Sequence, residues 1–241
     1  MKYLIDTHFH IDNYRNYLDV ANKINELEQY TLCVTNSPGV FRSCKKIFEN
    51  SKYLQFAIGF HPCERTLKKS DLEDFLWQSR NTNYIGEVGL DFSRAEHLPK
   101  EFQIDCFDKI IRNASEYNKL ITVHIRNAER EALKIINEYK PRKCIIHWYT
   151  GPENLLEEFL EMDCYFSINN NMIAGKSNSK YLRIPKDRLL IESDGPFTRV
   201  NGKKYSPELL KQQYENIAKF YSEPDLIMLI YGNFRKVLRE C

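Results

Sequence analysis

The sequence lacks any long apolar segment. No stretch of its 241 residues approaches the roughly 18 consecutive apolar residues that a membrane-spanning helix needs. The chain reaches Asp6 after the short apolar run Tyr3-Leu4-Ile5, which is too brief for the core of a secretory signal peptide. We therefore expect a protein that makes no membrane association.

Cysteine pairs of the C-x-x-C kind are also missing. The seven cysteines are an odd number, and several lie inside apolar runs, where a thiol behaves as a small hydrophobic side chain. This usage is typical of reduced thiols and favours a cytoplasmic protein.

Internal repeats, low-complexity tracts and Gly/Ser linkers are absent as well. Neither positive nor negative residues predominate. Lys and Arg number 35 against 33 Asp and Glu, a formal charge of +2, so the overall charge says little about partners. With 42% hydrophobic and 13% aromatic residues, the chain can form a large core. We expect one domain over residues 1–241.

Short apolar runs alternate with amphipathic segments along the chain. Residues 102, 106, 107, 110, 111 and 114 form one buried helical stripe, and similar stripes occur near 133–139, 155–160 and 210–221. The candidate strands are Tyr3–Ile5, Thr31–Thr35, Tyr53–Gly59, Tyr84–Val88, Ile121–Val123, Cys144–Ile146, Cys164–Ile168 and Leu189–Ile191. Strands that alternate with helices fit either a (β/α)8 barrel or an open doubly wound sheet.

Potential metal ligands follow most of these runs. Five of the six histidines and two carboxylates occupy such positions: His8, His10, His61, His124, His147, Glu87 and Asp194. In a barrel, the carboxyl ends of all eight strands surround one opening, so ligands from distant strands can meet there. The placement therefore favours an α/β protein of the (β/α)8 TIM-barrel type.

The residue types in this set suit divalent cations. His8 and His10 lie two apart in an extended segment, so both imidazoles point to the same side. A buried Glu87 needs a cation or hydrogen-bond partners, and a carboxylate can bridge two metals. Each residue alone also fits a structural role, namely a polar histidine or a salt-bridged core glutamate. Together with Asp194 they indicate a site for Zn²⁺, Mn²⁺ or Mg²⁺.

Several motifs in one order resemble the TatD family of metal-dependent hydrolases, within the amidohydrolase-like barrel superfamily. The resemblance runs nearly end to end. It rests on Asp6-Thr7-His8-Phe9-His10, Gly59-Phe60-His61-Pro62, Gly86-Glu87-Val88-Gly89-Leu90-Asp91-Phe92, Val123-His124-Ile125-Arg126-Asn127-Ala128, His147-Trp148-Tyr149-Thr150-Gly151 and Glu192-Ser193-Asp194-Gly195-Pro196.

The resemblance implies two divalent cations per chain and hydrolysis of DNA phosphodiester bonds, often as an exonuclease. It assigns the first cation to His8, His10 and Asp194 and the second to His124 and His147, with Glu87 shared. Departures at Trp148-Tyr149, Ser193, Gly195 and Asn169-Asn170-Asn171 leave these ligands intact but bear on substrate preference. This divergence would fit a TatD-like member of a bacterial phage-defence operon, such as the Qat type, with protein partners from that operon.

A two-cation hydrolase of this kind gives the nearby side chains particular roles. We expect Asp194 to take the proton of the attacking water, with Glu87 as the catalytic bridge, and His61 to hydrogen-bond the scissile phosphate. Arg126 either clamps a phosphate or pairs with Asp91.

Three further residues near these motifs have open or minor roles. Glu192 either holds a further metal or a leaving-group water, or is structural. We expect Asp6 to orient His8 or His10, and His97 to lie on the surface.

Basic residues crowd one segment near the end of the chain. Eight lie between Lys176 and Lys204: Lys176, Lys180, Arg183, Lys186, Arg188, Arg199, Lys203 and Lys204. They predict a basic lip that binds a polyanion, with Tyr181, Phe197 and Tyr205 stacking on unpaired bases. The alternative is an ordinary solvated face with aromatics packed inward.

These observations favour a metal-dependent DNase, an exonuclease acting on single-stranded DNA ends, because a duplex would enter a narrow barrel mouth poorly. Two alternatives stay open. One is a metal-dependent acyl or amide hydrolase, for example on an aminoacyl-tRNA, since the same cations polarise a carbonyl. The other is a noncatalytic partner in a larger assembly.

Overall fold

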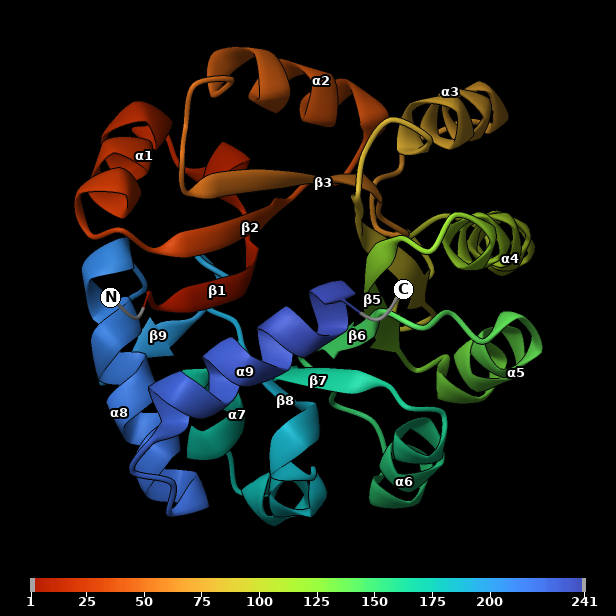
Figure 1. Ribbon diagram of the computed structural model, residues 1–241. Coiled ribbons are helices and arrows are strands. Elements are labelled where there is room, and N and C mark those ends of the chain that lie inside the picture. The colour runs from red at the N-terminus through yellow and green to blue at the C-terminus, as the bar shows by residue number, and fades with distance from the viewer. Residues whose placement is uncertain (1–2, 240–241) are drawn as a thin grey trace.

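The computed structural model describes residues 3–239. Within them, eight parallel strands follow one another in sequence order around a central barrel (Figure 1). They are β1 Ile5–Phe9, β2 Tyr30–Val34, β3 Leu54–Phe60, β4 Tyr84–Asp91, β5 Leu120–Arg126, β6 Cys144–His147, β7 Tyr165–Ile168 and β8 Leu189–Ile191. The strands are almost wholly buried because their side chains fill the barrel on one face and pack against helices on the other.

Helices connect successive strands and surround the barrel (Figure 1). The α-helices are α1 Tyr17–Glu26, α2 Pro38–Ile47, α3 Lys69–Ser79, α4 Lys100–Glu116, α5 Glu129–Tyr139, α6 Glu153–Glu161, α7 Asn170–Ala174, α8 Leu210–Tyr221 and α9 Leu226–Arg239. On α4, the stripe predicted in residues 102–114 faces the core of the protein, since Cys106, Phe107, Ile110 and Ile111 are buried. No helix in the described part of the chain combines the length and the apolar character of a membrane span.

The barrel closes between its last and first strands through residues that lie just beyond β8. The Asp194 N–H donates to the His8 carbonyl at 2.9 Å, and the His10 N–H donates to the Gly195 carbonyl at 3.0 Å. These bonds join the two ends of the sheet and bring Asp194 beside the histidines of β1. The predicted (β/α)8 barrel is confirmed, and the open-sheet alternative is not.

Several strands extend further than the apolar runs indicated. β1 runs from Ile5 to Phe9 rather than ending at Ile5, and β4 continues to Asp91. His8 and His124 therefore lie inside strands and not after them. The difference has a physical reason: polar residues that face a common cation site keep the extended backbone, so hydrophobicity alone places the strand ends too early.

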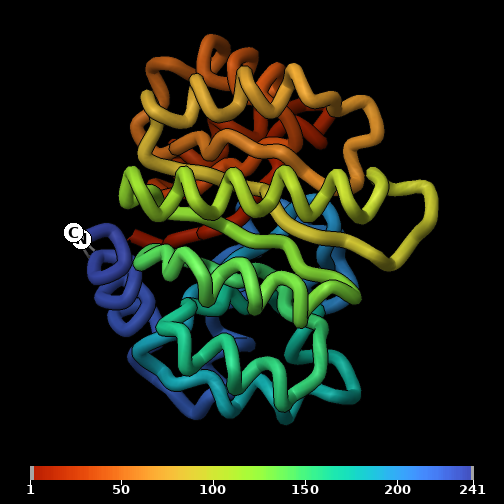
Figure 2. The backbone as a smooth tube through the Cα atoms, turned by 90° about the vertical axis from the view of Figure 1, so that its right-hand side faces the viewer, coloured from red at the N-terminus to blue at the C-terminus, as the bar shows by residue number. Residues whose placement is uncertain are grey.

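Helix α9 covers the amino-terminal end of the barrel. It lies across the front of the strands in Figure 1 and closes the left-hand end of the molecule in Figure 2. The Asn233 side chain donates to the carbonyls of Leu189, at 2.8 Å, and Lys186, at 2.7 Å, and Phe234 packs against Tyr30. With that end sealed, the carboxyl ends of the strands form the accessible mouth.

A candidate metal centre at the barrel mouth

The six predicted metal ligands come together at the carboxyl ends of the strands. They are His8 and His10 on and after β1, Glu87 on β4, His124 on β5, His147 at the end of β6, and Asp194 beyond β8. All except the partly exposed His124 are buried. Burying so many ionisable groups without partners would cost several kcal/mol each, so the cluster needs a charge that compensates its members.

One group of donors surrounds a point between β1, β4 and β8. The His10 Nε2 atom lies 3.2 Å from Glu87 Oε2 and 3.3 Å from Asp194 Oδ1, and it lies 3.3 Å from His8 Nε2. Donors at about 2.0–2.1 Å from one tetrahedral ion lie about 3.3 Å apart. The spacing of this group therefore fits a single divalent cation.

A second group faces the other oxygen of Glu87. The Oε1 atom lies 2.9 Å from His147 Nε2 and 3.0 Å from His124 Nδ1, and these two nitrogens are 3.2 Å apart. Glu87 thus presents one oxygen to each group. The donor set of imidazoles and carboxylates suits Zn²⁺, Mn²⁺ or Mg²⁺.

The electrostatics of the cluster favour positive charge at its centre. Burial opposes ionisation of Glu87, but the surrounding His61 and His147 hold its pKa well below the usual range. Burial likewise lowers the pKa of His10, yet hydrogen bonds with Asp194 and Glu87 raise it to about 10. Glu87 thus remains charged and favours protons on the imidazoles around it, and a divalent cation would supply the same positive charge.

Glycine allows β4 to lie close to its neighbour. Gly89 has a φ of +153°, and a Cβ there would lie 1.9 Å from the His124 carbonyl oxygen. Only a residue without a side chain permits this approach. Gly89, two residues beyond Glu87, therefore lets β4 pack closely against β5 at the level of His124.

Glu192 is fully buried beside His147 and is engaged by the protein. Its oxygens accept hydrogen bonds from the Trp148 N–H at 3.1 Å, the Asn169 amide at 2.9 Å and the Ser167 hydroxyl. One oxygen also lies 3.5 Å from His147 Nδ1. This favours the structural alternative, a carboxylate that positions His147, over one that holds a further metal or a leaving-group water.

Asp6 acts on the backbone and not on the imidazole rings. Its Oδ1 atom accepts from the Ser193 N–H at 2.8 Å and the His8 N–H at 3.3 Å, and Tyr205 donates to Oδ2 at 3.4 Å. Burial raises the pKa of Asp6 to about 7. The prediction that Asp6 orients His8 holds only in the sense that it fixes the His8 main chain.

Sequence reasoning missed the role of Asp91. Its Oδ2 atom lies 3.0 Å from His124 Nε2, so it fixes the ring whose other nitrogen faces Glu87. Burial opposes ionisation, but the hydrogen bonds of His124 and Ser93 hold the pKa of Asp91 well below its usual range. The alternative pair between Arg126 and Asp91 does not form within residues 3–239. The expectation that His97 lies free on the surface is wrong, since its side chain is 10% exposed and lies 3.3 Å from Asp91.

A cavity of about 330 Å³ opens above the cluster. His61, Arg126, Trp148 and Phe197 line it together with the candidate ligands. The His61 Nδ1 atom accepts the Cys63 N–H at 3.1 Å, which leaves Nε2 as the protonated nitrogen, 3.1 Å from Glu87. Burial lowers the pKa of His61, so a neutral imidazole presents this donor at the cavity wall.

The aromatic residues proposed for base stacking differ in accessibility. Phe197 is 57% exposed and lies at the cavity edge, 5.4 Å from the His10 ring. Tyr181 and Tyr205 are buried, and their hydroxyls are bonded inside the protein, so stacking by these two is contradicted. The inward-packing alternative is correct for them.

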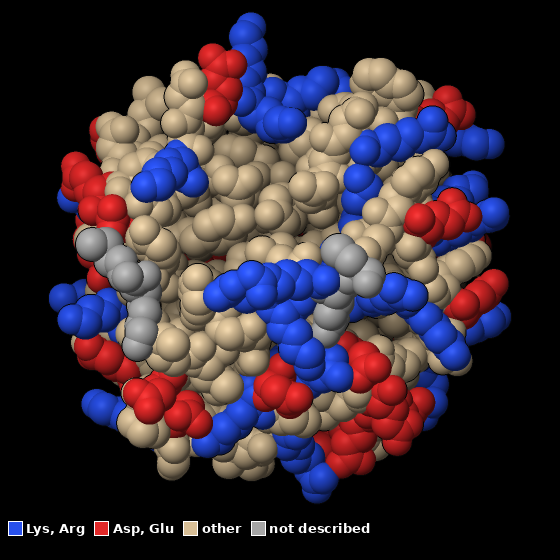
Figure 3. Space-filling view, in the orientation of Figure 1, with Lys and Arg blue, Asp and Glu red and all other residues tan. Residues whose placement is uncertain are grey.

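The basic segment is not one lip. Lys186 and Arg188 precede β8, at the end that α9 covers, and they pair with Glu223 and Asp163. Arg183 pairs with two glutamates of α6. Basic side chains also gather near the middle of the α9 face (Figure 3). Only the parts that follow β7 and β8, including exposed Lys203 and Lys204 on the β9–β10 hairpin (Arg199–Val200 and Lys203–Lys204), lie toward the mouth.

Comparison with known proteins supports the family suggested by the motifs. The sequence profile of the family described as TatD related DNase matches residues 5–239. The chain is 29% identical over 234 residues to the uncharacterized metal-dependent hydrolase YabD of Bacillus subtilis, covering 90% of each chain. It is 31% identical over 264 residues to the uncharacterized metal-dependent hydrolase BU355 of Buchnera aphidicola, covering 97% of this chain and 98% of that one.

A named nuclease and a solved structure are also similar. The deoxyribonuclease Tat-D of Schizosaccharomyces pombe is 27% identical over 171 residues, which cover 64% of this chain and 55% of that protein. The crystal structure of YjjV, a TatD homologue from Escherichia coli K12, superimposes with a TM-score of 0.86 at 20% identity and covers 97% of each chain. The latter supports the fold.

Proposed function

Because the chain belongs to the TatD related DNase family and is thus a metal-dependent hydrolase, we propose that it hydrolyses phosphodiester bonds in DNA, as an exonuclease acting on single-stranded ends. The observation that carries the proposal is the division of Glu87 between two donor groups. One oxygen faces His10 at 3.2 Å and the other faces His147 at 2.9 Å. Such a bridging carboxylate is typical of two-cation phosphoesterases.

Six side chains would hold two divalent cations, Zn²⁺, Mn²⁺ or Mg²⁺. His8, His10 and Asp194 would hold the first, and His124 and His147 the second, with Glu87 shared. Glu192 and Asp91 would position His147 and His124 from behind. When bound, such a pair supplies an activated water and polarises a phosphoryl oxygen.

The chain's own residues would move the protons and hold the phosphate. Asp194 lines the cavity and would take the proton of the attacking water. His61 would donate its Nε2–H to a nonbridging phosphate oxygen, which gains charge in the transition state. Arg126 is exposed at the cavity edge, without an ion pair in the described part of the chain, and would hold an adjacent phosphate.

The cavity favours a single strand. Its volume of about 330 Å³ is close to that of a small ligand, so a duplex end would have to unpair to reach the cluster. Phe197 at the rim would stack on a base next to the scissile bond, while Lys203 and Lys204 would contact backbone phosphates.

The test is a panel of end-labelled single-stranded and double-stranded DNA and RNA, each with Mg²⁺, Mn²⁺ or Zn²⁺. We expect stepwise loss of nucleotides from single-stranded DNA, abolished by chelation and by Asp194→Ala. Cleavage of ester or amide substrates with none of DNA would favour the acyl-hydrolase alternative. Metal binding with no turnover of either would favour the noncatalytic alternative.

Protection against phage is a further prediction of the same proposal. The charged cavity and intact ligand set suit degradation of invading DNA, and partner proteins of a defence operon would then direct the activity. Plaque counts on cells that carry the operon with wild-type or Asp194→Ala protein test this role; equal counts would contradict it.

A further inference from the structure

A second cluster of metal-binding side chains lies beside the candidate centre. Cys63 follows β3, Asp91 ends β4, and His97 lies in the loop that leads to α4. The Cys63 sulfur is 3.4 Å from Asp91 Oδ2 and 3.4 Å from His97 Nδ1, and the latter nitrogen is 3.3 Å from Asp91 Oδ1. Three different donor types therefore converge on one point.

These separations are those of a zinc coordination sphere. Sulfur at about 2.3 Å and nitrogen or oxygen at about 2.0–2.2 Å from one tetrahedral zinc lie about 3.3–3.6 Å apart. Asp91 is buried, and the side chains of Cys63 and His97 are partly covered, so the point between them is largely shielded from solvent. Three protein donors leave one position for a water molecule.

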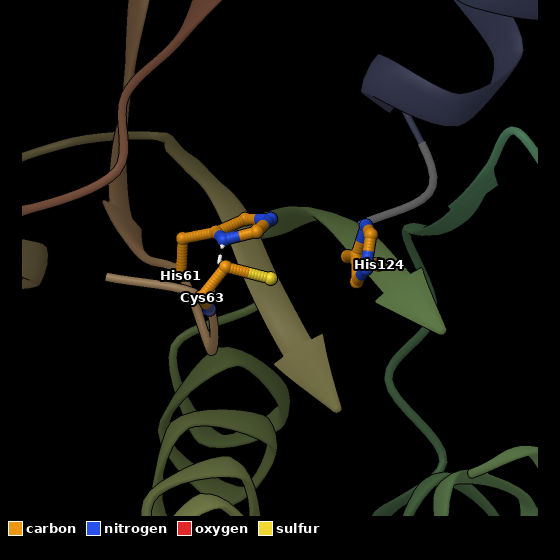
Figure 4. A group of neighbouring side chains, drawn as sticks. All are labelled: His61, Cys63 and His124. Atoms are coloured by element: carbon orange, nitrogen blue, oxygen red, sulfur yellow. Dashed lines mark hydrogen bonds between the residues drawn. The ribbon is translucent and has the colours of Figure 1, made fainter. Parts of the chain in front are cut away.

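Cys63 differs from the other described cysteines. Cys33, Cys44, Cys106, Cys144 and Cys164 are all buried. In Figure 4, by contrast, the Cys63 side chain lies beside His61 with its sulfur directed toward His124. Among the described cysteines, Cys63 alone lies close enough to imidazole and carboxylate donors to share a metal ion with them.

We propose that Cys63, Asp91 and His97 bind a zinc ion, separate from the six-residue centre. The thiol selects the metal, since sulfur ligands suit Zn²⁺ whereas Mg²⁺ takes oxygen. Binding releases the thiol proton to solvent and leaves a thiolate ligand. This inference does not rest on the proposed nuclease activity.

The position of this ion ties it to the main centre. Asp91 uses Oδ1 toward His97 and Oδ2 toward both Cys63 and His124 Nε2. The zinc fixes the Asp91 carboxylate, and that carboxylate fixes the His124 ring. The proposed zinc thereby holds the His124 imidazole of the neighbouring centre in place through Asp91, without contacting it.

Cobalt substitution tests the proposal directly. Thiolate bound to Co²⁺ gives a charge-transfer absorption in the near ultraviolet, which the imidazole and carboxylate ligands of the main centre do not produce. We expect this band in the wild-type protein and in Asp194→Ala, and its loss in Cys63→Ser and in His97→Ala. Cys44→Ser, which changes a buried thiol on α2, is the matched control and should keep it.

Zinc content gives a second readout. After dialysis against dilute Zn²⁺, Cys63→Ser should hold one ion less per chain than both wild type and Cys44→Ser. The absence of a thiolate band from the wild type, or its persistence together with full zinc content in Cys63→Ser, would overturn the proposal. In that case the three side chains form only a hydrogen-bonded support for His124. The band is read without any nuclease substrate, so this failure is distinct from failure of the proposed function.

Discussion

At the scale of single residues, Glu87 occupies the most connected position in the candidate centre. His8, His10, His61, His124 and His147 all lie within 3.6 Å of its two oxygens. The negative charge of this one carboxylate therefore acts on both groups of candidate metal ligands at once. Its removal should therefore have a different effect from removal of a ligand that serves one group.

The first prediction compares Glu87→Ala with His147→Ala. Glu87→Ala should lower occupancy of both metal positions, whereas His147→Ala should weaken mainly the second. For Glu87→Ala, we expect the transition state to lose several kcal/mol of charge stabilisation, which corresponds to a fall in activity of about 10³-fold. Elemental analysis of the purified variants measures the ratio of metal to protein. Wild-type occupancy at both positions in Glu87→Ala would rule out the bridging role.

The second prediction concerns Glu192, which we propose acts through His147. Glu192→Gln keeps the shape but removes the charge behind the imidazole, so the metal affinity of the second position should fall about 10–100-fold. Titration of the apoprotein with metal measures it, and Ser167→Ala, which removes one donor to Glu192, should have a smaller effect in the same direction. An unchanged affinity in Glu192→Gln would restrict Glu192 to a packing role.

The sequence indicated the candidate ligands more clearly than the residues that position them. Motifs in the sequence indicated all six candidate ligands, because imidazoles and carboxylates beside strand ends are conspicuous. Asp91 and His97 were missed, since their role depends on the contact between β4 and β5 and on a loop that folds back. Such contacts leave no spacing pattern in the chain.

At the scale of elements, the third prediction concerns the approach of β4 to β5. Gly89→Ala places a Cβ 1.9 Å from the His124 carbonyl at a φ of +153°, so it should destabilise the protein by about 2 kcal/mol or more. Gly232→Ala on α9 is the control. Nothing lies within 4 Å of a Cβ there, and alanine should stabilise the helix by about 0.5–1 kcal/mol. Urea denaturation measures both, and effects of the same sign would contradict the argument.

Element order was predictable from the alternation of apolar runs and helical stripes, but element ends were not. The basic segment shows the consequence. Lys186 and Lys203 are close in the sequence, yet β8 runs between them and carries the chain from the sealed end of the barrel to its mouth. Counting charges along the sequence therefore put into one group residues that the fold places at opposite ends of the barrel.

At the scale of the whole molecule, the candidate centre joins the first and last strands. His8 and His10 belong to one side of the closure and Asp194 to the other, so an ion bound between them would cross-link the two ends of the barrel. The fourth prediction is that chelation destabilises the protein. At a free metal concentration of 100 times Kd, binding contributes about 2.7 kcal/mol.

Chelation should therefore lower Tm by about 5–10 °C for a chain of this size. Differential scanning calorimetry with and without chelator measures the shift, and Asp194→Ala should show little of it. A full shift in that variant would place the stabilising metal elsewhere.

The last prediction concerns the surface around the mouth. If Lys203 and Lys204 contact nucleic acid, their replacement by Glu should weaken binding of single-stranded DNA. It should also reduce the slope of log affinity against log salt by about 1.4, since each lost phosphate contact removes about 0.7. Lys45→Glu with Lys46→Glu on α2 makes the same change in net charge away from the mouth and should leave the slope unchanged. Hydrolysis of the small diester bis(p-nitrophenyl) phosphate needs no such contact and should survive in both double variants. Equal losses on DNA and on the small ester would mean that the hairpin shapes the centre itself, whereas no loss on either would make it an ordinary solvated surface.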